Sequence, residues 1–314
     1  MQEFTYLSSD GKTTLGASLW LPQQEPYRGI VQICHGMVEH MGRYEWLAGQ
    51  LTDKGYIVCG DDHLGHGRSA DNQTLGYFGE RDGWRHLVED EHLLRLLMQK
   101  QYPSMPYYLL GHSMGSFITR EYITQYAAGL KGYICCGTSG RNPLIGFALV
   151  LSNVMVALQG GKHIGRLLNR LAFQNYNRHY YNRHFGEVVT GVEWLSRDAA
   201  QYLPFANDPK CHFTFTNAGF RDLFRLLHRI SGKQWSNRVP KELPILILSG
   251  EEDPVGNYGK GVRQVYGWLK KSGIHALQLK LYPEARHELH NELNRDEFVE
   301  DVLAFLSCHS GIES

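Results

Sequence analysis

Short apolar runs alternate with helical repeats along most of the chain. The apolar runs are as long as strands and lack polar alternation, which is typical of strands that are covered on both faces. Between them, apolar residues recur at the spacing of a helix that buries one face. The runs that we interpret as buried strands cover residues 29–34, 56–59, 107–110, 132–136 and 244–249. This order predicts an α/β fold in which a mostly parallel central sheet has helices on both faces.

Two segments near the ends of the chain show the alternation of half-buried strands. Residues 4–6 and 17–21 alternate on either side of a Ser-Asp-Gly turn at 9–11, which predicts a β-hairpin. Residues 277–281 alternate in the same way and predict the last strand of the sheet. A helical pattern over 298–305 follows that strand and predicts the final helix.

The regular order stops between residues 141 and 216. This segment is aromatic, basic and helical in parts, and it contains no convincing strand. Because a crossover between parallel strands needs only about a dozen residues plus its helix, we expect an insertion here. The prediction is a core formed by residues 1–140 and 217–314, a mainly helical cap over 141–216, and a crossover helix at 220–230. Ligands bind at the carboxyl edge of the sheet in such folds, and the cap is expected to cover that edge.

The candidate nucleophile follows the strand at 107–110. That strand runs into Gly111-His112-Ser113-Met114-Gly115, and a helical pattern begins at once. Strand, G-x-S-x-G and helix together form the context of a nucleophile elbow. So sharp a turn strains the backbone of Ser113, and only glycine at positions 111 and 115 lets the neighbouring elements come so close. The turn also leaves the Ser113 hydroxyl near the first amides of the helix, where negative charge is favoured.

A serine hydroxyl becomes a good nucleophile only when an oriented base takes its proton. In this arrangement the acid and the histidine follow the serine in chain order. The acidic candidates are Glu251, Glu252 and Asp253, and we select Asp253 because it forms a turn with the proline after it. The histidine candidates are His287 and His290, and we select His287 because it lies nearer the end of the last strand.

Two backbone amides are expected to stabilise the charge that develops on the substrate oxygen. One belongs to Met114, directly after the nucleophile, and the other to Met37, after the strand at 29–34. Gly36 permits the close approach that the second amide requires. Each such donor is worth roughly 3 kcal/mol in the transition state.

Composition narrows the classes of function. The chain of 314 residues is 42% hydrophobic and 20% charged and carries no net formal charge, which describes an ordinary globular protein and gives no sign of a nucleic-acid partner. Its 16 histidines show no metal-ligand spacing, so we expect no metal and no organic cofactor. The longest apolar stretch, 145–158, is too short to span a bilayer, and no leader peptide is evident. Cysteines that lie mostly within apolar runs favour free thiols and a cytoplasmic location.

Five segments together resemble the monoacylglycerol lipase and lysophospholipase family of α/β-hydrolases. They are residues 35–44, 61–69, 111–115, 250–255 and 284–292, and residues 206–211 add a weaker match. The resemblance implies a serine hydrolase that cleaves monoacylglycerol or lysophospholipid esters through an acyl-enzyme intermediate. It also implies Ser113, Asp253 and His287 as the triad and the amides of Met37 and Met114 as the oxyanion hole. The rest of the cap departs from the eukaryotic lipases, so the resemblance does not extend to their acyl-length and head-group preferences.

Three other functions stay open at this point. A short-chain carboxylesterase would use the same machinery. An iminopeptidase-like enzyme would need an acidic cap residue to hold a substrate amine, for which Glu187 and Glu193 are available. A non-catalytic binding protein would usually lack one triad residue, and here all three positions are occupied by suitable residues.

The cap offers further hypotheses about the substrate. Residues 147–158 form either a lid helix that meets an acyl chain or a membrane surface, or a helix that packs the cap on the core. The basic and aromatic segment 177–184 either meets a phosphate head group or forms a solvated loop. Trp194 and Phe205 are candidate pocket residues. The expected partner is a small acyl ester or lipid, with transient contact at a membrane surface through the cap, and the oligomeric state stays open.

Overall fold

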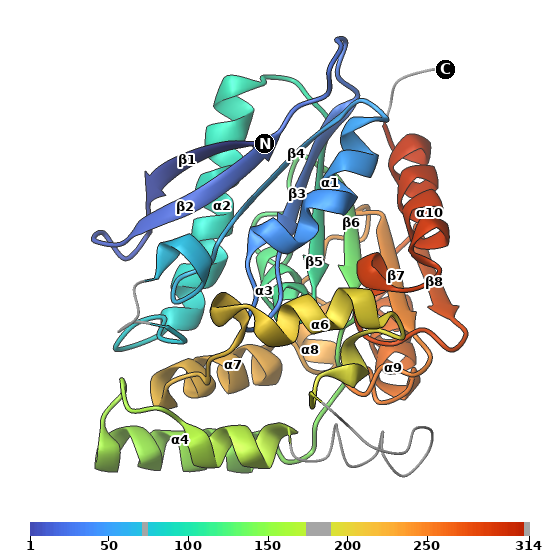
Figure 1. Cartoon of the computed structure of the whole chain (residues 1–314). Helices are drawn as coiled ribbons and strands as arrows, with labels where there is room; N and C mark the ends of the chain where they lie inside the picture. Colours follow the sequence, from blue (N-terminus) through green and yellow to red (C-terminus); the bar gives the residue numbers. More distant parts are fainter. Residues whose placement is uncertain (71–74, 174–189, 311–314) are drawn as a thin grey trace.

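One eight-stranded sheet runs through the computed structural model, which describes residues 1–70, 75–173 and 190–310 (Figure 1). Strands β1 and β2 form an antiparallel hairpin, β2 pairs antiparallel with β4, and every pair from β4 to β8 is parallel. The order across the sheet is β1 (Gln2–Leu7), β2 (Thr14–Trp20), β4 (Tyr56–Asp61), β3 (Gly29–Cys34), β5 (Tyr107–His112), β6 (Leu130–Cys136), β7 (Ile245–Gly250) and β8 (Leu277–Tyr282). The predicted mostly parallel sheet is confirmed.

Helices cover both faces of this sheet because its central strands are apolar on both sides. In β3, for example, Val31 and Ile33 join one buried cluster, whereas Ile30 and Cys34 join the other. The first cluster contains residues of α1 (Glu45–Thr52) and α10 (Arg295–Cys308). The second contains residues of α2 (Gly83–Gln101), α3 (Met114–Tyr122) and α9 (Lys260–Lys271).

The long connection between β6 and β7 lies beyond the carboxyl ends of the parallel strands (Figure 1). Its described part contains α4 (Ile145–Gln159), a helical segment at 166–173, and α6 (Ala199–Asn207). It then returns to the core through α7 (Asn217–Arg229) and the short α8 (Lys233–Ser236). Across 137–173 and 190–244 the structure contains no strand, only the isolated bridge between Ile164 and Thr216. The limits of the cap at 141 and 216 stay a prediction.

Two helix starts differ from the sequence pattern, and capping explains both. The spacing of Tyr44, Leu47 and Leu51 predicts a helix over 43–54. The structure instead has a 3-10 turn, η1 (Met41–Tyr44), before α1, and His40 Nδ1 accepts the Gly42 N–H at its start. The crossover helix α7 begins at Asn217, because Thr216 Oγ1 caps it by accepting the Gly219 N–H. Apolar periodicity does not show where such caps lie.

Candidate active site

Ser113 occupies a strained turn between β5 and α3. Its backbone angles are φ 53° and ψ −119°, which cost a non-glycine residue about 1–3 kcal/mol. The two motif glycines allow the turn: a Cβ on Gly111 would lie 2.6 Å from the Gly115 carbonyl oxygen, and one on Gly115 would lie 2.5 Å from the His35 carbonyl oxygen. The backbone at this point is thus the one that the G-x-S-x-G pattern predicts.

Asp253 and His287, which the sequence places after two different strands, meet at this end of the sheet. His287 Nδ1 lies 2.9 Å from Asp253 Oδ2. Asp253 is fully buried, and its carboxylate also accepts the Val255 N–H at 2.8 Å and the Ser249 hydroxyl at 3.3 Å. With Nδ1 facing Asp253, the other ring nitrogen of His287 is left for a partner on the cavity side.

The His287 ring is enclosed on several sides. The Trp194 ring lies 5.0 Å from it and the His112 ring 4.8 Å, measured between centroids. Gly137 adds close backbone contact, since a Cβ there would lie 3.1 Å from His287 Cε1. Trp194 belongs to the long connection between β6 and β7. This connection therefore helps to hold the His287 ring in place and also covers it.

The alternative histidine and acids lie elsewhere. His290 belongs to the 3-10 turn η5 (Leu289–Asn291), where its ring stacks on Tyr44 at 4.5 Å. Burial and the neighbouring His112 lower the pKa of His290 to about 3. Glu251 is exposed and Glu252 half-buried. None of these three residues contributes to the cavity wall among the described residues.

The loop after β3 leaves one amide open. Gly36 N–H donates to Glu39 Oε1 at 2.5 Å, and Val38 N–H donates to His66 Nε2 at 3.2 Å. The Gly36 carbonyl accepts from His35 Nδ1 at 2.8 Å, which fixes the peptide plane that carries the Met37 N–H. Within the described ranges, the Met37 N–H itself makes no hydrogen bond.

Met114 N–H is the second open amide. As the first residue of α3, Met114 has no carbonyl one turn earlier in the helix to receive its N–H, and no other partner occurs among the described residues. Met37 and Met114 both line the same cavity as Ser113. The two amides are therefore available to an anionic oxygen bound there.

This cavity has a volume of about 540 Å³ and is mainly apolar. Ser113, His287, Met37 and Met114 share its wall with side chains from the core and the cap. The apolar wall includes Phe117, Ile145, Phe147, Ala148, Leu151, Leu168, Leu171, Ala172, Phe173, Trp194, Phe205, Leu223, Phe224, Leu227 and Val255. Both predicted pocket aromatics, Trp194 and Phe205, are thus on the wall. Of the other cap predictions, Glu187 and the segment 177–184 lie outside the described residues.

A buried ion-pair network borders the cavity and was not foreseen from the sequence. Arg43 lies 2.8 Å from Glu39 and 2.6 Å from Glu288, and the Phe205 ring covers its guanidinium at 4.6 Å. Although burial alone would raise the pKa of Glu288, Arg43 holds it down at about 2. The network joins the loop after β3 to the loop that carries His287. In the sequence, this ion-pair network is indicated only by the charged residues within segments 35–44 and 284–292.

Comparisons with known proteins agree with this geometry. The family model of serine aminopeptidase, S33 (Hydrolase_4) matches residues 25–294. The chain is 28% identical to a monoacylglycerol lipase of Mycolicibacterium smegmatis, with 93% of this chain and 92% of that protein covered. It is also 28% identical to the monoglyceride lipase of Homo sapiens, with 93% and 86% covered.

A solved structure extends the similarity to the whole fold. A highly thermostable carboxyl esterase from Bacillus coagulans, solved in complex with glycerol, superposes with a TM-score of 0.89 at 35% identity, with 98% of each chain covered. The resemblance to lipase-like α/β-hydrolases is confirmed. The chain belongs to the serine aminopeptidase S33 (Hydrolase_4) family and has the α/β-hydrolase fold of that family.

Proposed function

We propose that this protein is a serine hydrolase that cleaves carboxylic esters of monoacylglycerols. The observation that supports this most directly is the cavity, which combines Ser113, His287 and two open amides with a long apolar wall. A volume of about 540 Å³ lies within the usual range for small-molecule sites. An ester with an apolar acyl chain matches this lining, because the ester group suits the polar groups around Ser113 and the acyl chain suits the apolar wall.

The proposed reaction uses Ser113, His287 and Asp253 in turn. His287 takes the Ser113 proton as the hydroxyl oxygen attacks the ester carbonyl, and the amides of Met37 and Met114 hold the tetrahedral oxyanion. His287 then gives its proton to the leaving alcohol, and the acyl group stays on Ser113. Water, activated by the same histidine, releases the fatty acid. Asp253 orients His287 through the 2.9 Å contact and stabilises its charged form.

The cavity lining favours a neutral head group. Among its described residues there is no lysine and no arginine, so a phosphate group would find neither of the side chains that most often pair with it on this part of the wall. The polar side chains of Ser139, Asn142 and Asn169 on this wall are neutral hydrogen-bonding partners of the kind that hydroxyl groups use. We therefore rank monoacylglycerol above lysophospholipid as the substrate.

An aminopeptidase activity, which the name of the family describes, is less well supported. A free substrate amine would need an unpaired carboxylate, and the acidic residues on the described wall, Glu39 and Glu288, both pair with Arg43. The Glu193 carboxylate accepts the Thr190 N–H at 2.6 Å and is not part of that wall. Ester hydrolysis requires none of these charges.

The outer face of α4 supports transient contact with a lipid surface. Leu144, Phe147, Val150 and Leu158 expose 63–77% of their surface there, and Phe147 also lines the cavity. An exposed apolar face of this kind is typical of an interaction surface. In the part of the chain that the structure describes, no helix combines the length and apolarity that crossing a bilayer demands. A cytoplasmic location with peripheral contact stays a prediction.

A chain-length series tests the proposed function. Monoacylglycerols, lysophosphatidylcholines and aminoacyl-anilides would be compared by kcat/KM, with Ser113→Ala as the blank. Each methylene buried in the cavity contributes up to about 0.8 kcal/mol, so four more should raise kcat/KM by up to roughly two orders of magnitude, with glycerol esters preferred.

The outcomes separate the alternatives. A maximum at acetyl or butyryl esters would leave a short-chain carboxylesterase, and a preference for anilides would indicate a peptidase. Ser113→Ala should lower turnover on the order of a million-fold. Wild-type activity in that variant would refute the nucleophile, and failure of the wild-type serine to react with a fluorophosphonate would indicate a binding protein.

A further inference from the structure

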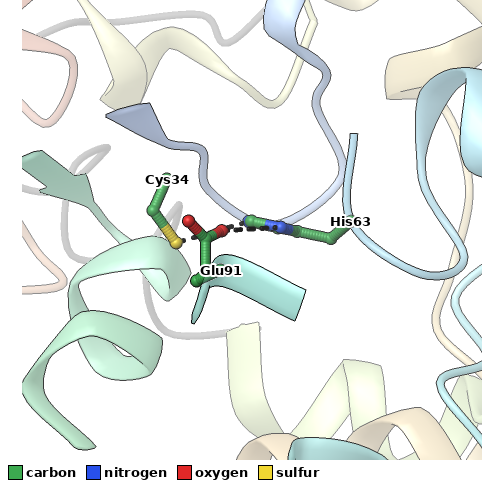
Figure 2. Close-up of side chains that lie close together, drawn as sticks. All are labelled: Cys34, His63 and Glu91. Carbon is green, nitrogen blue, oxygen red and sulfur yellow. Dashed lines mark hydrogen bonds and ion pairs between the residues drawn. The ribbon is translucent and has the colours of Figure 1, made fainter. Parts of the chain in front are cut away.

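A group of buried polar side chains lies next to the loop that carries the Met37 amide. His63, in the loop after β4, lies beside Glu91 of α2 and Cys34 of β3 (Figure 2). The Cys34 sulfur is 3.6 Å from His63 Nε2. The His63 ring also stacks on the His35 ring, with 3.8 Å between their centroids. Since none of these four residues is on the described cavity wall, they do not contact a substrate bound there.

Hydrogen bonds determine which nitrogen of the His35 ring carries the proton. The backbone N–H of His63 donates to His35 Nε2 at 3.1 Å, so Nε2 is an acceptor without a hydrogen. The proton is therefore on Nδ1, which donates to the Gly36 carbonyl at 2.8 Å. In a trans peptide the carbonyl and the following N–H point in opposite directions. Holding the Gly36 carbonyl against the His35 ring thus turns the Met37 N–H away from that ring.

The surroundings of His63 favour a proton on both of its ring nitrogens. Nε2 donates to the His35 carbonyl at 3.0 Å, because a carbonyl can only accept. Nδ1 faces Asp61 Oδ1 at 3.6 Å and Glu91 Oε1 at 3.4 Å, two buried oxygens without a hydrogen-bond partner in the described ranges. Buried carboxylates are costly unless a positive charge compensates them. Although burial opposes that charge, Asp61 and Glu91 raise the pKa of His63 to about 9.

We propose that a charged His63 is a positioning residue for the oxyanion hole, because it holds His35 in the tautomer that fixes the Met37 amide. The inference rests on the proposed function, in which that amide stabilises the oxyanion. The charge also keeps the neighbouring ring neutral, since burial and His63 lower the pKa of His35 well below its ordinary value. A doubly protonated His35 could not accept the His63 N–H.

His66 holds the other side of the same loop. Its Nε2 accepts the Val38 N–H at 3.2 Å, and its Nδ1 donates to the Leu64 carbonyl at 3.1 Å. Burial and the charge on His63 lower the pKa of His66 to about 3, so this ring stays a neutral acceptor. The Met37 N–H thus lies between two peptide groups that are both held by neutral histidines.

Nitrogen NMR of the full chain, labelled in its histidine side chains and assigned through the backbone, tests the protonation states. At neutral pH we expect two protonated ring nitrogens in His63. In His35 we expect a protonated Nδ1 and an unprotonated Nε2. A neutral His63, or a proton on His35 Nε2, would overturn the proposal.

His63→Gln tests the link to the oxyanion. The glutamine amide can still donate to the His35 carbonyl, but it carries no charge. We expect kcat to fall by up to about a hundredfold, as for other small displacements of catalytic groups, with KM nearly unchanged because only the transition state loses an interaction. His92→Gln, on α2 and likewise stacked on an aromatic ring, is the matched control and should keep the wild-type kcat.

A trifluoromethyl ketone with an apolar chain separates positioning from a general loss of structure. Ser113 adds to its carbonyl carbon, His287 takes the hydroxyl proton, and the resulting oxyanion occupies the hole. In His63→Gln, affinity for the ketone should fall by the same factor as kcat/KM, whereas affinity for an unreactive monoalkylglycerol ether should stay unchanged. No loss for the ketone, or an equal loss for both ligands, would overturn the proposal alone. A wild type that binds the ether but not the ketone would refute the proposed function together with this inference.

A double variant covers the case in which His63→Gln does not fold. Glu91→Gln, combined with His63→Gln, removes one of the two carboxylates that His63 compensates and keeps an acceptor for Gln32. We expect the double variant to fold and to show the same selective loss for the ketone. Wild-type affinity for the ketone in the double variant would overturn the proposal.

Discussion

Gly115 shows how closely the backbone is packed around the reactive serine. A Cβ at this position would press on the carbonyl oxygens of Cys34 and His35, which are part of the backbone and cannot rotate away. Gly267, inside α9, has no atom within 4 Å of the same point. The two glycines thus provide a matched pair for substitution.

Gly115→Ala should destabilise the protein by about 3 kcal/mol, the upper end of what overpacking usually costs, and should lower esterase activity because Ser113 moves with the turn. Gly267→Ala should be neutral or stabilise by up to about 1 kcal/mol. Urea unfolding of both variants measures the difference. Equal stability of the two variants would contradict the close packing described for the turn.

Glu288 provides a pH-dependent test of the Arg43 network. Its pKa of about 2 in the folded protein lies below the ordinary 4.5, so the unfolded chain binds this proton first as the pH falls. The stabilisation, on the order of 3 kcal/mol, is complete above about pH 4.5 and is lost between that pH and about 2. In Glu288→Gln, the free energy of unfolding should therefore fall less steeply on acidification.

Urea unfolding between pH 6 and pH 3 would compare Glu288→Gln with the wild type and with Glu284→Gln, whose carboxylate is exposed. The Glu284 variant should follow the wild-type curve. If the Glu288 variant follows it as well, the ion pair does not contribute as described.

The residues proposed to react were easier to locate in the sequence than the residues that pack around them. Ser113 lies in a local motif, and Asp253 and His287 follow strands that the pattern locates. Glu39, Arg43 and Glu288 carry no local signal, because their function depends on two distant loops being folded together.

Among the elements, α4 differs most from an ordinary surface helix. Only Ile145 and Ser152 are buried in it, although most of its residues are apolar. From the sequence, a lid and a packing helix were equal alternatives for this segment. In the structure, one side of α4 lines the cavity and packs along α7, while the other is exposed.

Val150→Ser and Leu158→Ser should each weaken binding to phospholipid vesicles roughly tenfold, because each removes an apolar side chain worth about 1.5 kcal/mol when buried in lipid. Neither residue is on the described cavity wall, so hydrolysis of a dissolved short-chain ester should stay unchanged. Vesicle co-sedimentation measures the binding. Leu96→Ser, on exposed α2 surface, is the control, and equal binding by all variants would exclude α4 as the contact.

At the scale of the whole molecule, the described part of the β6–β7 connection and the sheet share one apolar interior. Ile145 and Leu168 from the long connection belong to the same buried cluster as Leu109 of β5 and Ile247 of β7. Helix α7 carries Phe220 and Leu226 into that cluster as well. Such continuity favours unfolding as one unit.

Thermal unfolding should therefore show a single transition, with tryptophan fluorescence and far-UV circular dichroism changing at the same midpoint. The six tryptophans of the chain include Trp194 in the β6–β7 connection and the fully buried Trp235. Two separate midpoints would show that the cap folds independently.

The overall architecture was predictable where it depends on local pattern. Buried strands and helices could be located because burial selects apolar residues with a fixed period. The order of the strands across the sheet could not be read in this way, since β3 lies between β4 and β5 and pairing depends on contacts between distant segments. The shape of the cavity depends on side chains from many such segments.

The position of the base near the end of the chain has a consequence for synthesis. His112, beside the nucleophile, and His287 are 175 residues apart in sequence, and β8, the edge strand before His287, is the last to join the sheet. At ordinary translation rates this separation takes roughly 10–35 s. During that interval a nascent chain already contains Ser113 but not His287, the base of the proposed reaction. On the proposed mechanism, each molecule is therefore inert while it is being made and becomes active only when its final strand and helix have emerged.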